Sequence, residues 1–226
     1  MSQEKIWDKE YSNPVFLTKK NEPQADVLKF VKFIKKEKID IENYKVLDLG
    51  SGTGRNSFYF AKLGADVSGV EISKTAIDLA KKQANDESLH IKYIKQSMGD
   101  LLPFEPNSFD LLLDVTSSNS LNEKEREVYL SETNRVLKKN GYFFTKALCK
   151  EGDENAKNLL KNFPGKEKDT YIMPETKIIE RVWVKEDFIS TYQKYFNIIK
   201  IDKKTSYSKI NNRSYKRNFW IAYMKK

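Results

Sequence analysis

The sequence predicts an α/β fold in which a Rossmann-like, mostly parallel sheet of seven strands carries helices on both faces. The first indication is a strand that breaks into a glycine-rich loop before an apolar segment of helical length, at residues 45–63. The second is the repetition of strand and helix patterns after it, which is typical of βαβ units. The third is a pair of extended segments, 197–207 and 218–224, joined by the polar turn SKINNRSYK. This pair predicts a C-terminal antiparallel hairpin.

The region before the first strand, residues 1–44, carries WDKEY, then a polar link that contains proline, and then an amphipathic segment at 24–38. Trp7 and Tyr11 stand one helical turn apart, and one interpretation makes them core anchors of an N-terminal helix. The amphipathic segment predicts a helix packed on the sheet. Its apolar residues recur at helical spacing: Val27, Phe30, Val31 and Ile34.

The stretch Lys45–Arg55, KVLDLGSGTGR, organises the rest of the chain. It combines a short buried strand with glycines at every second position, Gly50, Gly52 and Gly54. A loop with so few Cβ atoms turns sharply and lets its backbone approach a ligand closely. The helix that follows, with Gly64 as its stop, supplies free N–H groups and positive potential at its start. We therefore expect a nucleotide-binding turn here.

Two common nucleotide loops do not match this spacing. The dinucleotide fingerprint requires G-x-G-x-x-G, and Arg55 stands where its third glycine should be. The phosphate loop requires a Lys-Ser or Lys-Thr that this loop lacks. What remains is D-x-G-x-G-x-G, whose Asp48 would repel a pyrophosphate but suits a ligand that carries an ammonium group.

The elements that follow alternate between strand and helix. Asp66–Ile72 predicts a second strand that ends in an acid, Glu71, 23 residues after Asp48. Ser73 then caps the next helix. His90–Met98 predicts the third strand.

The fourth strand is expected at Leu111–Leu113, because a continuous apolar run suits the middle of a parallel sheet. Asn122 and Glu125 have the spacing of a capping box for a long helix through Leu137. We expect Gly141 to stop that helix and Tyr142–Cys149 to form strand five.

Length and composition limit the class of protein. The 226 residues suit one domain, 1–226. A single cysteine, Cys149, excludes a disulfide within the chain and fits a reducing compartment. The sequence has no apolar leader segment and no run of about 18 apolar residues. We expect a soluble, cytoplasmic protein with no membrane partner.

The net charge of +9 is unevenly placed, with nine Lys or Arg against one acid, Asp202, between Ile199 and Lys226. One interpretation is compositional, since only six of the 41 basic residues are Arg. The other is a basic face for nucleic acid or another anionic partner. The compositional interpretation is favoured, because base and phosphate contacts more often use Arg.

VLDLGSGTG, together with LPF and SFD before the fourth strand, resembles the first motifs of the class I S-adenosylmethionine-dependent methyltransferases. GTGRNS and the N-terminal Trp resemble most the small tellurite-resistance and thiopurine-type methyltransferases. The resemblance covers most of the chain, with specific motifs over 45–118. It implies the strand order 3-2-1-4-5-7-6 and S-adenosylmethionine as cofactor.

The resemblance also assigns roles to residues at the carboxyl edge of the sheet. Asp48 would lie near the ammonium group of the methionine portion, and Glu71 would bind both ribose hydroxyls. Many relatives have an Asp after strand three that accepts from the adenine amine. Met98 stands at that position here, so backbone contacts or Asp100 must replace it. Trp7 and Tyr11 become possible lid residues over the methionine end. The cofactor-binding set implied in this way is Asp48, Gly50, Ser51, Gly52, Glu71, Ile72, Ser97, Met98, Asp114 and Tyr11.

The catalytic residue stays open in the sequence. Methyl transfer from a sulfonium needs positioning more than a base. Asp114 is a weak candidate base, and the same position commonly just orders its loop. Cys149 is expected to be a small core residue, and His90, the only histidine, to lie at the opposite edge of the sheet. No metal ligand set is expected. Without a clear base, a thiol, carboxylate or imidazole nitrogen acceptor is slightly favoured over an alcohol.

The segment between strands five and six, residues 150–196, is longer than a single crossover helix requires. Helices are expected at 153–163 and 186–196. We interpret the insertion as a substrate cap, in which Pro164–Trp183 is mobile and its Tyr171 and Trp183 close over an apolar acceptor.

The sequence therefore favours a methyltransferase that acts on a small-molecule acceptor by in-line transfer. One alternative is an RNA or protein methyltransferase that docks through the basic C-terminal hairpin. The other is a non-catalytic module that binds S-adenosylmethionine. The oligomeric state stays open.

Overall fold

A computed structural model describes residues 2–13, 22–210 and 213–226. Nine strands occur in the described ranges: β1 (Lys45–Leu49), β2 (Asp66–Glu71), β3 (Ile91–Lys95), β4 (Phe109–Val115), β5 (Leu137–Leu148), β6 (Thr170–Ile172), β7 (Ile179–Arg181), β8 (Asn197–Ile210) and β9 (Arg213–Lys225). The helices are α1 (Gln3–Ser12), α2 (Ala25–Lys36), α3 (Arg55–Lys62), α4 (Lys74–Asp86), the short 3₁₀ helix η1 (Ser118–Ser120), α5 (Glu123–Val136), α6 (Glu154–Asn162) and α7 (Lys185–Tyr192).

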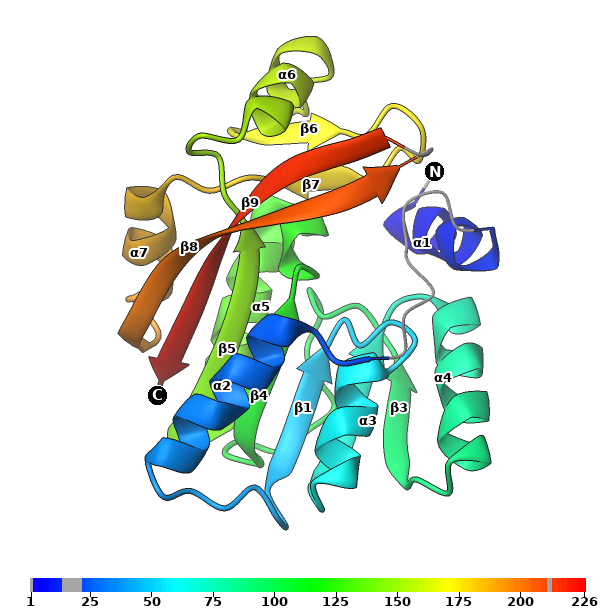
Figure 1. Cartoon of the computed structure of the whole chain (residues 1–226), viewed down its shortest axis with the longest axis vertical. Coiled ribbons are helices and arrows are strands. Elements are labelled where there is room, and N and C mark those ends of the chain that lie inside the picture. The colour runs from blue at the N-terminus through cyan, green and yellow to red at the C-terminus, as the bar shows by residue number, and fades with distance from the viewer. Residues whose placement is uncertain (1, 14–21, 211–212) are drawn as a thin grey trace.

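Seven strands form the main sheet, in the order β3-β2-β1-β4-β5-β9-β8 (Figure 1). The first five are parallel, and β9 is antiparallel to both β5 and β8. Because β6 and β7 pair only with each other, the main sheet has the expected order 3-2-1-4-5-7-6 when its own strands are counted. The predicted fold class is confirmed.

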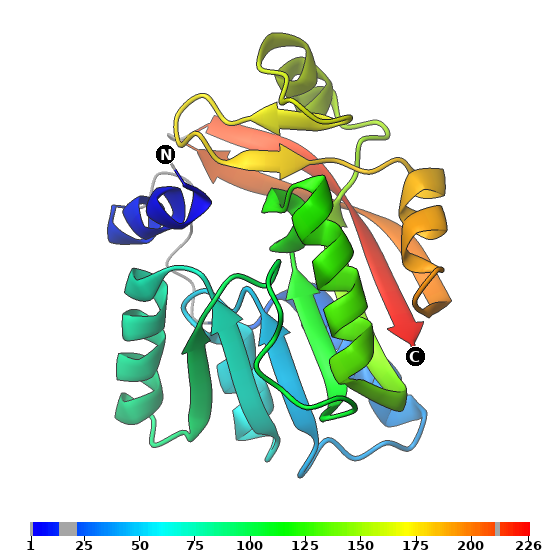
Figure 2. The same ribbon diagram turned by 180° about the vertical axis from the view of Figure 1, so that it is seen from behind.

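Helices cover both faces of the sheet. On one face α2 and α3 pack against apolar side chains of the central strands, and α4 packs on Tyr93 of β3. On the other face α5 and α7 bury Tyr129, Phe188 and Tyr192 against Leu112, Phe143 and their neighbours (Figure 2). The apolar run Leu111–Leu113 of β4 is buried on both faces, as a central parallel strand requires.

Local sequence signals account for where the helices begin. The Ser73 hydroxyl accepts from the Ala76 N–H at the start of α4. Asn122 and Glu125 form the expected capping box at α5. Asp153 accepts from the Ala156 N–H at α6. These caps satisfy amide groups that have no partner inside the helix.

One predicted boundary is wrong. Gly141 does not stop α5, which ends at Val136 and passes directly into β5. The pairing of β4 with β5 jumps from Phe109–Leu137 to Leu111–Tyr142, so residues 138–141 form an irregular turn inside the strand. A Cβ on Gly141 would lie 2.6 Å from Leu137 Cδ1 and 2.9 Å from the Lys138 carbonyl oxygen. Gly141 is needed because the chain comes this close to itself. In the sequence, a glycine in such a strand irregularity looks the same as a glycine that ends a helix.

The remaining elements leave space above the carboxyl ends of the parallel strands. Helix α1 lies above α4 on one side of that space, and the β6–β7 hairpin with the far ends of β8 and β9 lies on the other (Figures 1 and 2). In the part of the chain that the structure describes, no helix has the length and apolar character needed to cross a membrane.

Candidate functional site

A cleft of about 1340 Å³ occupies this space at the carboxyl edge of the sheet. Its walls come from the loops after β1, β2, β3 and β4, from α1, and from the β6–β7 and β8–β9 hairpins. Pockets for a single small ligand usually measure about 300–1,000 Å³. The cleft is therefore large enough for two molecules side by side.

The glycine loop forms the floor of the cleft. The N–H groups of Gly50 and Ser51 donate to the Val70 carbonyl oxygen at 2.8 and 3.1 Å, which fixes the loop against the end of β2. Gly50 and Gly52 have φ angles of +67° and +56°, which a residue with a Cβ adopts only with strain. The buried Ser51 hydroxyl has no hydrogen-bond partner among the described residues, and it lies toward Gly69 of β2.

Glu71 lies next to the loop and is 5% exposed. Its Oε2 accepts from the Gly52 N–H at 2.9 Å and its Oε1 from the Ser73 N–H at 2.8 Å. Burial raises the pKa of Glu71, and these two hydrogen bonds oppose that rise. Each carboxylate oxygen has a second lone pair. Glu71 therefore holds the loop and can still accept from two hydroxyl groups of a ligand.

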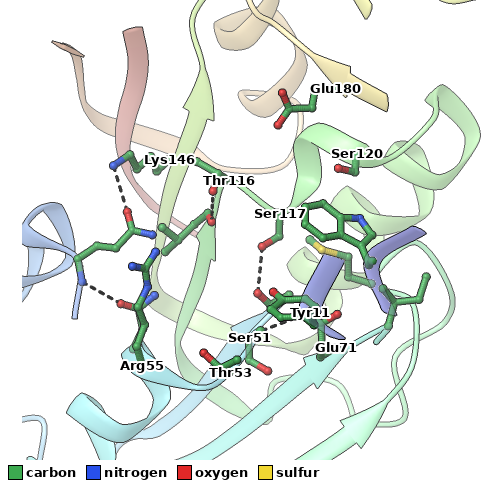
Figure 3. A pocket seen from close by; sticks show the side chains of 18 of the residues that line it. Tyr11, Ser51, Thr53, Arg55, Glu71, Thr116, Ser117, Ser120, Lys146 and Glu180 are labelled. Carbon is green, nitrogen blue, oxygen red and sulfur yellow. Dashed lines mark hydrogen bonds between the residues drawn. The ribbon is translucent and has the colours of Figure 1, made fainter. Parts of the chain in front are cut away.

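Helix α1 closes one side of the cleft with Trp7 and Tyr11. The Tyr11 hydroxyl lies 2.6 Å from the point where a Cβ on Gly52 would be, and Figure 3 shows the ring over the loop. Asp8 fastens the helix, because its Oδ1 accepts from Ser73 Oγ at 2.6 Å and from the Thr75 N–H at 3.0 Å. Both aromatic residues are thus in the lid position that the resemblance implied.

Ile72, Ser97 and Met98 line the cleft beside Glu71, as expected for the adenine side. Asp100 does not. It is exposed and lies outside the cleft, so the expectation that it replaces the missing Asp is wrong. The Gln96 side-chain nitrogen is occupied, since it donates to the Leu101 carbonyl oxygen. Ser97, the Gln96 side-chain oxygen and the backbone remain for polar contacts with a ligand at this end.

Two predicted site residues, Asp48 and Asp114, do not line the cleft. Asp48 Oδ2 accepts from Ser57 Oγ at 2.7 Å behind the glycine loop, and burial raises its pKa to about 6. The expectation that Asp48 reaches a ligand ammonium is therefore wrong.

Asp114 is fully buried. Its Oδ1 accepts from the N–H groups of Ser117 and Ser118, at 3.0 and 3.2 Å, and its Oδ2 accepts from the Tyr129 hydroxyl at 2.7 Å. Burial raises its pKa. All of these contacts order the loop after β4, so the interpretation of Asp114 as a base or a cofactor contact is wrong.

Arg55 is a cleft residue that the sequence analysis did not assign. It is the first residue of α3, and its guanidinium forms no hydrogen bond or ion pair with another described side chain. Burial lowers its pKa, although Tyr11 and Asp48 oppose this. Together with the free N–H groups of the α3 start, Arg55 makes this end of the cleft suitable for an anionic group. Its position after the third glycine was the available signal.

Lys146 is a second unassigned cation in the wall. Its Nζ donates to Asp26 Oδ2 at 3.0 Å and to Gln24 Oε1 at 3.1 Å, and burial lowers its pKa. Lys146 is therefore neutralised by Asp26, whereas Arg55 is not paired.

The end of the cleft away from Glu71 is a mixed apolar and charged space, which we call the acceptor chamber. It is lined by Leu148, Met173, Glu180, Tyr215, Arg217 and Phe219. Thr116, Ser117 and Ser120 separate it from the glycine loop, and Ser117 Oγ donates to the Gly50 carbonyl oxygen at 3.1 Å (Figure 3).

Tyr171 and Trp183, expected to close over an acceptor, are buried and do not line the cleft. Trp183 N–H donates to the Leu148 carbonyl oxygen, and its own carbonyl oxygen accepts from Trp220 Nε1. The pairing of β6 with β7 and these hydrogen bonds fix the β6–β7 hairpin as part of the cleft wall. That expectation is wrong for these two residues, and Met173 and Glu180 face the cleft instead.

Cys149 and His90 both lie outside the cleft. Cys149 is buried, and burial raises its pKa to about 11, so it is a core residue as predicted. His90 is exposed at the amino end of β3, on the predicted edge. Within the described ranges, no group of three His, Cys, Asp or Glu could hold a metal ion.

Comparison with known proteins agrees with this geometry. Residues 47–145 match a family model described as a methyltransferase domain. The ubiquinone biosynthesis O-methyltransferase of Pelagibacter ubique is 34% identical over 110 residues, which are 49% of this chain and 44% of that protein. The chain thus spans less than half the length of this curated relative.

Solved structures match over more of the chain. A protein of Methanosarcina mazei described as a SAM-dependent methyltransferase superimposes with a TM-score of 0.72 and 22% identity, covering 85% of this chain and 96% of that one. TehB from Haemophilus influenzae superimposes with a TM-score of 0.67 and 18% identity, covering 100% of this chain and 67% of that one. At these identities the matches establish the fold.

Proposed function

We propose that this chain, whose residues 47–145 match a methyltransferase domain, binds S-adenosylmethionine and methylates a small-molecule acceptor. The observation that carries the proposal is the pairing of the glycine loop with Glu71 in a cleft that has room for two molecules. The matched relative is an O-methyltransferase of ubiquinone biosynthesis, and it supports methyl transfer to a small molecule as the class of reaction.

Three groups of cleft residues would bind three different parts of the cofactor. Glu71 accepts from the two ribose hydroxyls. Ile72 and Met98 pack against the adenine. The glycine loop and the start of α3 hold the methionine portion, with Arg55 paired to its carboxylate. The close packing around Gly50 and Gly52 fits this assignment.

When bound, S-adenosylmethionine supplies a methyl group on a positively charged sulfur. The residues of this chain then act mainly by position, because a well-oriented acceptor atom about 3–3.5 Å from the methyl carbon gives most of the acceleration. Thr116, Ser117 and Ser120 border the chamber where that atom must lie. Helix α1 and the β6–β7 hairpin exclude water from the two sides. Residues 150–196 therefore serve as the substrate cap of a single domain, 1–226.

The small-molecule assignment is favoured over a macromolecular substrate by the walls of the acceptor chamber. The hairpins of this same chain enclose it, with Phe219 and Met173 as apolar surfaces. A folded protein or a duplex RNA does not fit such a space, whereas a compact organic molecule does.

Calorimetry with S-adenosylhomocysteine tests the proposal. We expect saturable binding by the wild-type protein and at least a roughly tenfold loss for Glu71→Ala, since charge-assisted hydrogen bonds contribute about 1.5–3 kcal/mol each. Glu87→Ala, which removes a carboxylate from the far end of α4, is the matched control and should bind normally. No binding by the wild type would refute the proposal, and unchanged affinity of Glu71→Ala would remove Glu71 from the site.

A second measurement separates an enzyme from a binding module. Radioactive methyl transfer to a panel of amines, thiols, carboxylic acids, phenols and imidazoles should identify at least one acceptor. Tight binding of S-adenosylhomocysteine with no transfer to any of them would favour the non-catalytic module.

A further inference from the structure

We propose that Glu180 recognises a cationic amine on the acceptor, so that the substrate is a small, partly apolar amine. This inference rests on the proposed function, because it concerns the molecule that lies beside the cofactor. It names a specificity residue in the β6–β7 hairpin, a segment outside the part of the chain that matches the methyltransferase domain.

The first observation is a buried carboxylate with one unused oxygen. Glu180 is 7% exposed and lies in the wall of the acceptor chamber. Its Oε2 accepts from the Tyr171 hydroxyl at 2.6 Å. Its other oxygen has no hydrogen-bond partner within the described ranges. Figure 3 shows the carboxylate directed into the open space above Ser117 and Ser120.

The second observation is the charge balance around it. Arg217 is the nearest cation to this carboxylate in the chamber wall, but it does not bind Glu180 directly. Its Nη2 donates to the Tyr171 hydroxyl at 2.6 Å, and its Nε donates to Asp153 Oδ2 at 3.3 Å. Asp153 and Arg217 are both buried, so they balance each other. Because Arg217 pairs with Asp153, Glu180 is left without an ion-pair partner among the described residues.

The other described cations that line the cleft are Lys82, Lys146 and Arg55, and none of them forms an ion pair with Glu180. Lys146 is on the opposite side of the opening in Figure 3, where it is paired with Asp26. Arg55 lies at the start of α3, in the position proposed for the cofactor carboxylate. Burying an uncompensated carboxylate is costly unless a partner neutralises it. A cationic ligand supplies that partner, whereas a neutral donor satisfies only the hydrogen bond.

The third observation is the character of the walls. Phe219 and Tyr215 line the chamber as aromatic surfaces, and Leu148 and Met173 as apolar ones. Lys146 Nζ already lies 4.6 Å from the centroid of the Phe219 ring. Tyr215 is left as the aromatic surface of the chamber whose ring can attract a further cation. Together these features favour an amine attached to a compact apolar body and disfavour a carboxylate acceptor.

Three probes of similar shape test the proposal: 2-phenylethylamine, 2-phenylethanol and 3-phenylpropionate. Their binding is measured by calorimetry or ligand-observed NMR on protein saturated with S-adenosylhomocysteine. We expect the amine to bind the wild type roughly tenfold more tightly than the alcohol, and the carboxylate to bind most weakly. Glu180→Gln should abolish the preference for the amine while leaving affinity for S-adenosylhomocysteine unchanged.

Glu175→Gln is the matched control, since Glu175 is an exposed acid in the same hairpin. It should keep the wild-type preference. The inference would be overturned if the wild type bound the three probes equally, preferred the carboxylate, or did not detectably bind the amine. It would also be overturned if the preference for the amine survived in Glu180→Gln. A Glu180 that only supports Tyr171 would lower the melting temperature on substitution without changing the order of the probes. Failure of the wild type to bind S-adenosylhomocysteine would refute the proposed function instead.

Discussion

Three acids at the carboxyl edge of the sheet resemble one another in sequence but lie in different environments. Glu71 is the last residue of β2 and faces the cleft. Asp48 and Asp114 are each one residue before the end of their strands, β1 and β4. In the register of the sheet Asp48 pairs with Gly69 and Asp114 pairs with Leu49, so the two carboxylates point to opposite faces of the sheet. Asp48 accepts from the Ser57 hydroxyl of α3. Asp114 accepts from the Tyr129 hydroxyl of α5 and from two amides of the loop after β4.

The buried environment of Asp48 predicts a dependence of stability on pH. Burial raises its pKa in the folded state to about 6, above its ordinary value of 3.8. An acid whose folded pKa is raised stabilises the protein below its unfolded pKa, and this stabilisation is lost as pH rises through the folded pKa. Between pH 5 and 7.5 the wild type should therefore lose about 1 kcal/mol of unfolding free energy that Asp48→Asn does not lose.

Urea unfolding of the ligand-free proteins at the two pH values measures this difference. The mutant serves as its own control for the other buried acids, Glu71 and Asp114, because their contribution is common to both proteins. Parallel pH profiles for the wild type and Asp48→Asn would contradict the prediction.

A second prediction concerns Gly52, whose φ of +56° is costly for a β-branched residue. Gly52→Val should abolish binding of S-adenosylhomocysteine and leave the fold largely intact, as judged by circular dichroism. Gly52→Ala is a milder change, and its new Cβ would meet the Tyr11 hydroxyl at 2.6 Å. Adding Tyr11→Phe removes that oxygen, so the double variant should recover part of the affinity that Gly52→Ala loses.

The comparison is a double-mutant cycle, and calorimetry of the four proteins gives the coupling between the two positions. If the effects simply add, the contact between α1 and the loop does not matter for binding. A folded Gly52→Val protein with normal affinity would mean that this loop is not the site.

At the scale of elements, the sequence predicted what local patterns encode. The glycine loop, the capping box of α5 and the apolar run of β4 each have a short-range signature, and all three are confirmed. Gly141 misled because a glycine after a helix and a glycine in a strand irregularity look alike in sequence. The direction of Tyr171 and Glu180 could not be predicted, since it depends on Arg217, which is distant in the chain. Trp183 depends in the same way on Leu148 and Trp220.

Helix α1 gives an element-level prediction, because its Asp8 binds the start of α4, in addition to the Glu4–Lys95 ion pair with β3. Asp8 accepts from Ser73 Oγ and the Thr75 N–H. Its partial burial raises its pKa, but these hydrogen bonds outweigh that and lower it overall. Asp8→Ala should loosen α1 by roughly 1–2 kcal/mol and weaken binding of S-adenosylhomocysteine, since Trp7 and Tyr11 are carried on α1.

Hydrogen exchange of the α1 amides measures the loosening directly. Asp78→Ala is the matched control, because Asp78 is exposed on α4 and pairs only with Lys74 among the described side chains. Faster exchange in α1 with unchanged exchange in α4 is the expected pattern. Unchanged exchange in Asp8→Ala would mean that other contacts hold the helix.

At the scale of the whole molecule, the net charge of +9 is less available than the sequence suggests. Several basic residues of the C-terminal hairpin are used within the fold. Lys226 Nζ donates to Asn107 Oδ1 and to the carbonyl oxygens of Asn134 and Leu137. Lys200 pairs with Asp202, and Lys204 lies 3.8 Å from Asp26. Arg217 is buried against Asp153. This arrangement favours the compositional interpretation of the charge.

The last prediction follows from that distribution and addresses the RNA alternative. A protein that neutralises many phosphates loses affinity steeply with salt, with a log–log slope of about −0.7 for each phosphate on single-stranded RNA. Few of the described hairpin cations are both exposed and unpaired, and Lys203 and Lys216 are among those few. We therefore expect weak binding of RNA, with a log–log salt slope no steeper than about −2. Fluorescence anisotropy of a labelled RNA, titrated at several salt concentrations, gives the slope.

The double variant Lys203→Ala/Lys216→Ala should flatten the salt dependence further, while Lys81→Ala/Lys82→Ala on the distant α4 should not. Tight binding with a slope of several units would instead make the hairpin a docking face for RNA.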